Sequence, residues 1–225
     1  KNFIFKKINL INEKKLSALI SRFKPDIVFH IGGQPGVLYS FKNPRIYLIN
    51  NEKATETLCK VCSKHKVKKF IFASSSSIYG DQKKFPIKES FKPNPKNFYA
   101  RTKLNSEKII IKFFQKKNIK YIIFRFFTVY GPYGRPDMFI HKFLNSIKMN
   151  KTINLHNNGL NFRDFTHVKD VVNILKLTIN TNLNKKIINI CRSKPIRTDK
   201  LVLLILKYYK NTNSKIKKIK NVKGE

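Results

Sequence analysis

The residues whose types and spacing best suit chemistry in this sequence are Tyr99 and Lys103, within the segment FYARTKLNSEK. They are four positions apart, so on a helix both side chains lie on one face, about a turn from each other. A phenol acts as a base near neutral pH only when its pKa lies far below the usual ~10, and a nearby ammonium group favours the phenolate. The pair could therefore transfer a proton, although in so lysine-rich a chain this spacing also arises readily by chance.

A run of consecutive serines, Ser74–Ser77, follows directly on the apolar segment KKFIFA. Serine fills a core poorly and is a poor helix former, so the run is expected at the end of a strand. Hydroxyl groups there either contact a substrate or satisfy backbone groups in a turn. If this strand end meets the helix that carries Tyr99 and Lys103, the two are parts of one active site.

The hydrophobic pattern alternates apolar runs of strand length with longer segments of helical period. The expected strands are FIFKKI (3–8), DIVFHI (26–31), KKFIFAS (68–74) and YIIFRFF (121–127), and the expected helices cover 12–23, 44–65 and 98–117. Strands that are apolar on both faces and separated by helices are typical of a covered parallel sheet. We therefore predict an α/β fold with a doubly wound parallel sheet, whose ligands bind beyond the carboxyl ends of the strands.

The pattern changes after about Pro136. Shorter elements follow, among them a helix over 139–150, the strands TINLHNN and KIINI, and helices from 168 and 198. This predicts a sheet domain over 1–136 and a smaller C-terminal lobe over 137–225. The chain begins at Lys1 on a strand-like segment and ends in a lysine-rich stretch, so we expect both domains to be partial.

Composition narrows the function classes. The 225 residues include 48 Lys+Arg against 12 Asp+Glu, a formal net charge of +36. The lysines are scattered over nearly every predicted helix and loop, which favours compositional drift over a nucleic-acid groove, and we expect no specific nucleic-acid partner. Cys59 and Cys62 form a single C-x-x-C pair inside a predicted helix, so no metal site is expected. No apolar run approaches the ~18 residues of a membrane span, which favours a soluble, cytoplasmic protein without a membrane partner.

The motifs ASSSSIYG, YARTK, RFFTVYGPYGRPDM and NNGLNFRDFT occur in this order along the chain. With them the chain resembles the extended short-chain dehydrogenase/reductase family, in particular its NAD-dependent nucleotide-sugar epimerases of the UDP-glucuronate 4-epimerase type. The likeness runs from FIFKKINLIN to NICRSK. It implies a Rossmann-like NAD-binding domain whose first strands are missing, a substrate-binding lobe, NAD as cofactor, a UDP-sugar as substrate and a homodimer. The implied reaction is epimerisation at C4 of UDP-glucuronate through a transient 4-keto sugar.

The resemblance also implies roles for individual residues. Ser75, four residues before Tyr79, would bond the reacting sugar hydroxyl; Tyr99 would transfer its proton; Lys103 would tune Tyr99 and hold the nicotinamide ribose. The residues implied to bind NAD are Asn9, Leu10, Ile31, Gly32, Gly33, Gln34, Asn50 (with Asn51 as a near competitor), Tyr99, Lys103 and Phe127. Those implied to bind substrate are Ser75, Ser76, Ser77, Thr128, Arg135 and Arg163.

The two arginines in this set would contact different parts of the substrate. By resemblance, Arg135 and Thr128 would meet the sugar carboxylate, and a guanidinium is suited to this because it binds a carboxylate bidentately. Arg163 would meet the diphosphate of UDP. Leu38 stands where the family usually has an arginine, which weakens the inference about that loop.

Other functions stay open. The family's Gly-x-x-Gly-x-x-Gly turn, which holds the NAD pyrophosphate, does not occur in the sequence. Another nucleotide-sugar epimerase (UDP-glucose or UDP-N-acetylglucosamine type), a dehydratase or a decarboxylase would share most of the motifs. The last two typically carry an acidic residue beside the catalytic Ser or Thr, and none lies between Ala73 and Gly80, which favours an epimerase. A non-catalytic basic remnant that binds nucleic acid is the alternative from a different class.

Overall fold

The computed structural model of the chain describes residues 3–209 and 213–220, which form two compact units. The first unit comprises Lys1–Asp81, Glu89–Phe126 and Thr178–Asn189; the second comprises Gln82–Lys88, Phe127–Leu177 and Ile190–Glu225. The division therefore differs from the sequence-based boundary at 136. It differs because the segment from Thr178 leads into strand β8 (Lys186–Ile190), which lies beside β3 (Lys120–Phe126) in the sheet of the first unit.

The first unit is built on a four-stranded sheet. Its strand order is β1 (Ile27–His30), β2 (Lys69–Ser75), β3 and β8, and both β1–β2 and β2–β3 are parallel pairs. In β2, Phe70, Ile71 and Phe72 are all buried, so both faces of the strand are covered. This is why the run is apolar at every position rather than at alternate ones. The predicted α/β fold class is confirmed.

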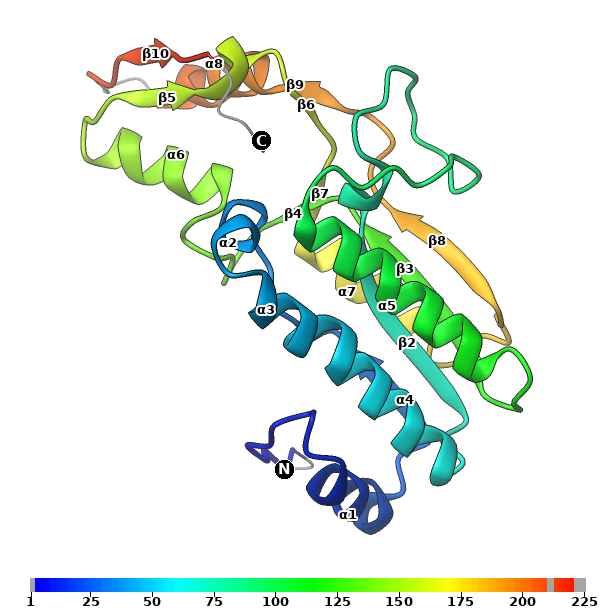
Figure 1. Cartoon of the computed structure of the whole chain (residues 1–225). Helices are drawn as coiled ribbons and strands as arrows, with labels where there is room; N and C mark the ends of the chain where they lie inside the picture. The colour runs from blue at the N-terminus through cyan, green and yellow to red at the C-terminus, as the bar shows by residue number, and fades with distance from the viewer. Residues whose placement is uncertain (1–2, 210–212, 221–225) are drawn as a thin grey trace. The chain divides into compact units, whose positions relative to one another are not determined.

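Three helices pack on the face of the sheet that carries Phe70 and Phe72: α1 (Glu13–Phe23), α4 (Ala54–Lys64) and α5 (Phe98–Phe114). The other helical segments of this unit are α2 (Val37–Lys42), α3 (Pro44–Tyr47), the π-helical segment η1 (Leu48–Lys53) and the 3-10 turn η2 (Ser76–Tyr79). Figure 1 shows α3 and α4 following one another, with α5 beside α4. The core between helices and sheet includes Leu16, Leu58, Cys59, Cys62, Phe70, Phe72, Ile110, Phe114 and Ile123.

The predicted strand over 3–8 is wrong. Phe3, Ile4 and Phe5 are exposed and irregular, and no strand among the described residues pairs with them. An apolar run becomes a strand only where a neighbouring strand satisfies its backbone groups. The chain becomes regular at Asn12, whose side chain accepts a hydrogen bond from the Lys15 N–H at 3.0 Å and so caps α1.

The second unit has shorter elements around its own core. They are β4 (Thr128–Tyr130), α6 (Phe139–Lys148), β5 (Ile153–Leu155), η3 (His156–Gly159), β6 (Phe162–Arg163), β7 (Phe165–His167), α7 (Val168–Leu177), β9 (Ile196–Arg197), α8 (Thr198–Tyr208) and β10 (Ile216–Lys218). The strands form three two-stranded pairs, β4–β7, β5–β10 and β6–β9. Phe143, Ile147, Ile153, Leu155 and Val202 pack together as the core. Over residues 3–209 and 213–220, none of the helices is long and apolar enough to cross a bilayer.

A buried lysine closes the far end of β2 in the first unit. Lys69 Nζ donates hydrogen bonds to the backbone carbonyls of Thr178 (2.7 Å), Ile179 (3.0 Å) and Thr181 (2.7 Å). Burial lowers the pKa of Lys69, and Lys120 nearby lowers it further. The contacts tie the segment that returns from the second unit to the start of β2.

We expect Lys69→Met to lower the free energy of unfolding by about 1 to 3 kcal/mol, because partly buried carbonyl oxygens lose their donor. Urea unfolding measures the change. Lys68→Met is the matched control, since Lys68 is exposed and pairs with Asp26 at the surface, and a surface ion pair contributes only ~0 to 1 kcal/mol. Equal effects of the two substitutions would contradict the prediction.

Candidate functional site

The serine run lies at the carboxyl end of β2, as its sequence predicts. β2 ends at Ser75, which caps the turn η2 and accepts hydrogen bonds from the Ser77 N–H at 3.2 Å and the Ser77 hydroxyl at 2.9 Å. Ser75, Ser76 and Ser77 are partly exposed, whereas Ser74 is buried. Ser77 therefore has a turn-forming contact, and Ser75 presents a hydroxyl held by the turn.

Tyr99 lies in the first turn of α5. Asn97 caps the helix by accepting a hydrogen bond from the Ala100 N–H at 2.8 Å. The Tyr99 N–H donates to Ser40 Oγ at 3.2 Å, and the Tyr99 ring meets the edge of Tyr47 with 6.2 Å between ring centroids. The cap and these two contacts fix where the helix begins and hold the aromatic ring of Tyr99.

Lys103 lies one turn further along α5 and is almost fully buried, with 6% of its surface exposed. Its Nζ lies 4.5 Å from the centroid of the Phe72 ring, and Phe72 precedes Ser75 by three residues on β2. Burial lowers the pKa of Lys103 to about 8, and Glu107 acts in the opposite direction. In the part of the chain that the structure describes, no carboxylate forms a salt bridge with Lys103, so its buried charge is offset only by the more distant Glu107, one turn further along α5.

The loop after β1 approaches the same cation. A Cβ atom built at Gly33 would lie 2.9 Å from Asn51 Oδ1 and 3.7 Å from Lys103 Nζ, whereas one at Gly32 would meet open space. Glycine at position 33 therefore lets the backbone come close to Asn51 and Lys103. This brings the predicted residues Gly33 and Lys103 together.

Asn51 connects that loop to α5. Its side chain accepts from the Gln34 N–H at 2.7 Å and donates to the Gln34 carbonyl at 3.2 Å and to Thr102 Oγ1 at 3.0 Å. Its own carbonyl accepts from the hydroxyls of Thr55 and Ser106. Asn51 lies within the π-helical segment η1, a helix type often found at functional sites.

The other residues expected to bind NAD differ in how exposed they are and in which unit they lie. Asn50 is exposed, whereas its competitor Asn51 is buried and contacts Gln34. Asn9 is exposed with its side chain accepting from the Ile11 N–H, and Leu10 packs against the core. Ile31 is half exposed at the end of β1, while Phe127 belongs to the second unit, where its N–H donates to the Ile190 carbonyl.

The substrate residues of the second unit lie on loops and short strands. The Thr128 N–H donates to the Asp164 carbonyl at 3.0 Å as β4 begins, and Arg163 lies exposed on β6. Arg135 binds Asp137 through two hydrogen bonds, Nε to Oδ1 at 2.9 Å and Nη2 to Oδ2 at 2.5 Å, and it lowers the pKa of Asp137. The guanidinium is thus shown in bidentate contact with a carboxylate.

A buried polar cluster near Ser75 and Lys103 was not among the predicted site residues. Glu107 of α5 and Arg125 of β3 are 2% and 4% exposed and form an ion pair, which also contacts Ser74 and Tyr79. Part of the signal was present in the sequence, since YIIFRFF places Arg125 inside an apolar run, whereas Glu107 lies in the polar stretch NSEK just before III. A buried charge is costly unless paired, so Arg125 indicated a buried partner, whereas the sequence did not identify that partner as Glu107.

A comparison with protein families decides what kind of chain this is. Residues 1–191 match the model of the NAD dependent epimerase/dehydratase family. The chain belongs to this family. Its relatives in the epimerase/dehydratase family include the uncharacterized protein MJ1055 of Methanocaldococcus jannaschii, 36% identical over 96% of this chain and 66% of that protein. They also include the UDP-glucuronate 4-epimerase of Thermodesulfobacterium geofontis, 34% identical over 76% of this chain and 53% of that protein.

Solved structures of epimerases have a similar fold. The chain is similar to the crystal structure of UDP-glucuronic acid 4-epimerase from Bacillus cereus in complex with UDP-glucuronic acid and NAD, with a TM-score of 0.90 and 30% identity over 99% of this chain and 70% of that one. The chain spans between 44% and 66% of the length of the first curated relatives that it matches. The family's fold and motifs are therefore present over a part of the relatives' length.

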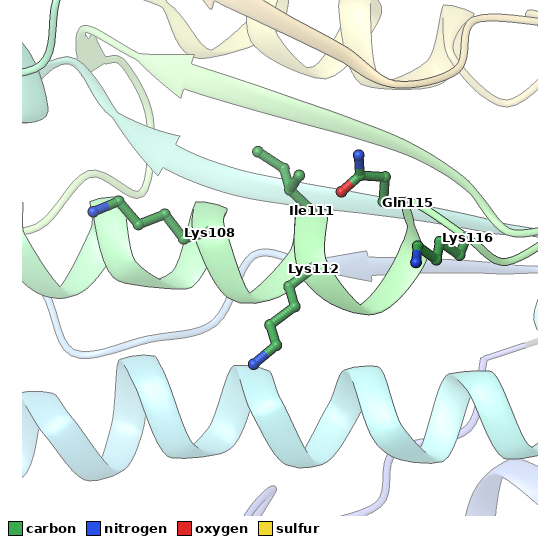
Figure 2. Close-up of a pocket in the computed structure, with 5 residues that line it drawn as sticks. All are labelled: Lys108, Ile111, Lys112, Gln115 and Lys116. Carbon is green, nitrogen blue, oxygen red and sulfur yellow. The ribbon is translucent and has the colours of Figure 1, made fainter.

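A hollow on α5 lies away from these residues. It has a volume of about 460 Å³ and is lined by Lys108, Ile111, Lys112, Gln115 and Lys116, whose side chains project from successive turns in Figure 2. None of the predicted site residues lines it. Within the described residues, no group of three His, Cys, Asp or Glu side chains could hold a metal ion.

Proposed function

We propose that this chain carries the catalytic residues of an NAD-dependent nucleotide-sugar 4-epimerase, with UDP-glucuronate as substrate and UDP-galacturonate as product. The observation that carries the proposal is the buried Lys103, one helical turn after Tyr99, beside the strand that ends in Ser75. An epimerase needs a proton-transfer group of this kind at the sugar hydroxyl. The 4-epimerases among the relatives support the choice of reaction.

The residues of the first unit fit the nicotinamide and ribose end of NAD. Lys103 offers a buried ammonium group with a lowered pKa, and Gly33 leaves the backbone open where a side chain would collide with Asn51. Lys103 would donate to the ribose hydroxyls, and Gln34, held by Asn51, would line the site. The sequence offers no glycine-rich turn for the pyrophosphate, so the fit concerns this end of the cofactor alone.

NAD, when bound, supplies a reversible hydride acceptor for C4 of the sugar. Tyr99 would take the proton of the C4 hydroxyl as C4 is oxidised to a ketone. It would return the proton when C4 is reduced on its other face. Ser75 holds the same oxygen by a hydrogen bond. The positive charge of Lys103 favours the phenolate form of Tyr99. Tyr99 thus ends in the protonation state in which it began, and the reaction involves no net oxidation.

Incubating the protein produced from its complete gene with NAD and UDP-glucuronate tests the proposal. NMR of the products should show UDP-galacturonate. UDP-xylose would indicate a decarboxylase, and a 4-keto-6-deoxy sugar would indicate a dehydratase. Turnover of UDP-glucose or UDP-N-acetylglucosamine in preference to UDP-glucuronate would retain the epimerase but overturn the substrate.

Arg135 is expected to select the uronic acid. Arg135→Ala should lower kcat/KM for UDP-glucuronate by at least about tenfold, because losing a charge-assisted contact to a carboxylate costs more than ~1.4 kcal/mol. Activity with UDP-glucose, which has no carboxylate, should change little. Initial rates with both nucleotides measure the difference.

Asp137→Asn is the matched control for Arg135→Ala. It removes the carboxylate that Arg135 binds but keeps the guanidinium, so the preference for UDP-glucuronate should be kept. If Arg135→Ala lowers activity equally with both nucleotides, Arg135 only shapes the loop. The choice of a uronic acid would then lose its main support.

A further inference from the structure

Four buried side chains form one hydrogen-bonded cluster beside the catalytic residues. Arg125 donates to Glu107 through Nε at 3.1 Å and Nη2 at 2.8 Å, and its Nη1 donates to the Tyr79 hydroxyl at 2.9 Å. The Ser74 hydroxyl donates to Glu107 Oε1. The guanidinium also lies over the Tyr79 ring, 4.9 Å from its centroid. We call these residues, Ser74, Tyr79, Glu107 and Arg125, the Glu107 clamp.

The clamp joins the elements that bear the catalytic groups. Glu107 lies on α5 one turn after Lys103, and Ser74 immediately precedes Ser75 on β2. Tyr79 ends η2, the turn that contains Ser76 and Ser77, and its hydroxyl donates to Asn189 Oδ1 at 2.7 Å. The clamp therefore links α5 to the serine run through hydrogen bonds of fixed direction.

Other contacts between α5 and β2 involve aromatic rings of the strand, as between Phe114 and Phe70 and between the Lys103 ammonium and Phe72. Apolar packing is non-directional and tolerates small shifts of one element along another, whereas hydrogen bonds fix distance and angle. Proton transfer requires the hydroxyl and the base to lie within a few tenths of an ångström of their productive separation. Apolar contacts alone would not maintain this alignment.

Stability gives no sufficient reason for the clamp. Replacing a buried ion pair with apolar residues of similar volume is often neutral or stabilising, because both charges lose their hydration on burial. Glu107 and Arg125 nevertheless lie in an otherwise apolar layer formed by residues such as Ile110 and Ile123. Their directional contacts to Ser74 and Tyr79 suggest a role in geometry.

We propose that Glu107 and Arg125 are positioning residues that hold the Ser75 end of β2 and the turn η2 in register with the face of α5 that carries Tyr99 and Lys103. The proposal rests on the proposed epimerase function for its effect on catalysis. Its structural part, a clamp on the serine turn, stands independently of the substrate.

The test is the triple variant Ser74→Ala/Glu107→Leu/Arg125→Met, which replaces both members of the buried ion pair and the Ser74 hydroxyl with apolar groups. We expect it to fold, and we expect the backbone amides of Ser75–Gly80 to exchange with deuterium at least about tenfold faster than in the wild type, which corresponds to ~1.4 kcal/mol. Amides of β1 should exchange as before. Unchanged exchange at Ser75–Gly80 would overturn the clamp.

Kinetics on the complete protein test the catalytic part. The triple variant should lose at least about tenfold in kcat with UDP-glucuronate while KM stays within about threefold, because alignment matters most in the transition state. The control is Glu13→Leu/Lys60→Met, which removes an exposed ion pair of α1 and α4 and should change neither kcat nor exchange. Wild-type kcat in the triple variant would overturn the positioning role.

Arg125→Lys is a second variant in case the triple variant does not fold. Lysine keeps a buried charge beside Glu107 but cannot form the fork that reaches both Glu107 and Tyr79. Like the triple variant, Arg125→Lys should speed amide exchange at Ser75–Gly80 and lower kcat, each by a smaller factor. Wild-type values of both would reject the proposal. If the wild-type protein turns over no nucleotide sugar, the epimerase function fails, whereas the exchange experiment still decides on the clamp.

Discussion

Tyr99→Phe should abolish nearly all turnover while leaving the protein folded. In the proposed mechanism the substitution removes the phenolic oxygen that takes and returns the proton of the C4 hydroxyl, and a positioned general base contributes about 10² to 10⁴ in rate. The phenyl ring can keep its contact with Tyr47, and the backbone N–H of residue 99 can still donate to Ser40. We therefore expect kcat to fall by about 10² to 10⁴, with the thermal unfolding temperature unchanged.

NMR of the UDP-glucuronate and UDP-galacturonate mixture measures the rate, and calorimetry measures the unfolding temperature. Tyr208→Phe is the matched control, because Tyr208 is 81% exposed on α8 and lies outside the predicted site. It should leave kcat unchanged. A Tyr99→Phe variant that retained kcat within about tenfold of the wild type would show that another group transfers the proton.

The sequence predicted the sheet well where strands are buried on both faces. β2 and β3 each contain a continuous apolar run, Phe70–Ala73 and Tyr121–Phe124, and these runs indicated where the strands lie. The pattern failed at 3–8, where an equally apolar run lacks a neighbouring strand among the described residues. Hydrophobicity indicates that a segment can form a strand, whereas pairing, which is not local, decides whether it does.

Long-range pairing also explains the domain boundary. Nothing in the sequence from 178 to 189 indicates that it belongs with β2 and β3, since its anchors are backbone carbonyls bound by Lys69 and the place of β8 next to β3. A boundary placed where the pattern of predicted elements changes assumes that each domain is one continuous segment. The two units here are both discontinuous.

In the candidate site, too, local features could be predicted from the sequence, whereas contacts between distant residues could not. The spacing of Tyr99 and Lys103 is local, and a capped helix places both residues as the spacing predicts. The choice between Asn50 and Asn51 was not accessible, because a π-helical turn changes which side chain points inward. The partners Glu107 and Arg125 are 18 residues apart, so each charge was visible in the sequence but the pair was not.

Lys103→Met should have opposite effects on activity and stability. The pKa of Lys103 is lowered by burial to about 8 from 10.5, and each pKa unit corresponds to ~1.4 kcal/mol. The charged lysine therefore costs the folded state on the order of 3 kcal/mol at neutral pH. Methionine has a similar length and no charge, so we expect the free energy of unfolding to rise by about 2 to 3 kcal/mol at pH 7.

The pH dependence identifies the cause. Between about pH 8 and pH 10.5 the folded wild type has released the Lys103 proton while the unfolded chain still holds it, so wild-type stability rises with pH in this range. The variant lacks that contribution. Its advantage over the wild type should therefore be full below pH 8 and shrink toward zero as the pH approaches 10.5, which urea unfolding at several pH values measures.

Turnover should fall at the same time, because the phenolate form of Tyr99 loses its neighbouring cation. A nearby opposite charge is worth about 1 to 3 pKa units, so we expect kcat at neutral pH to fall by about 10-fold to 10³-fold. Lys108→Met is the matched control on the exposed side of α5, and it should change neither quantity. A Lys103→Met variant that was less stable than the wild type at pH 7 would show that the ammonium group is stabilised by contacts that offset its burial.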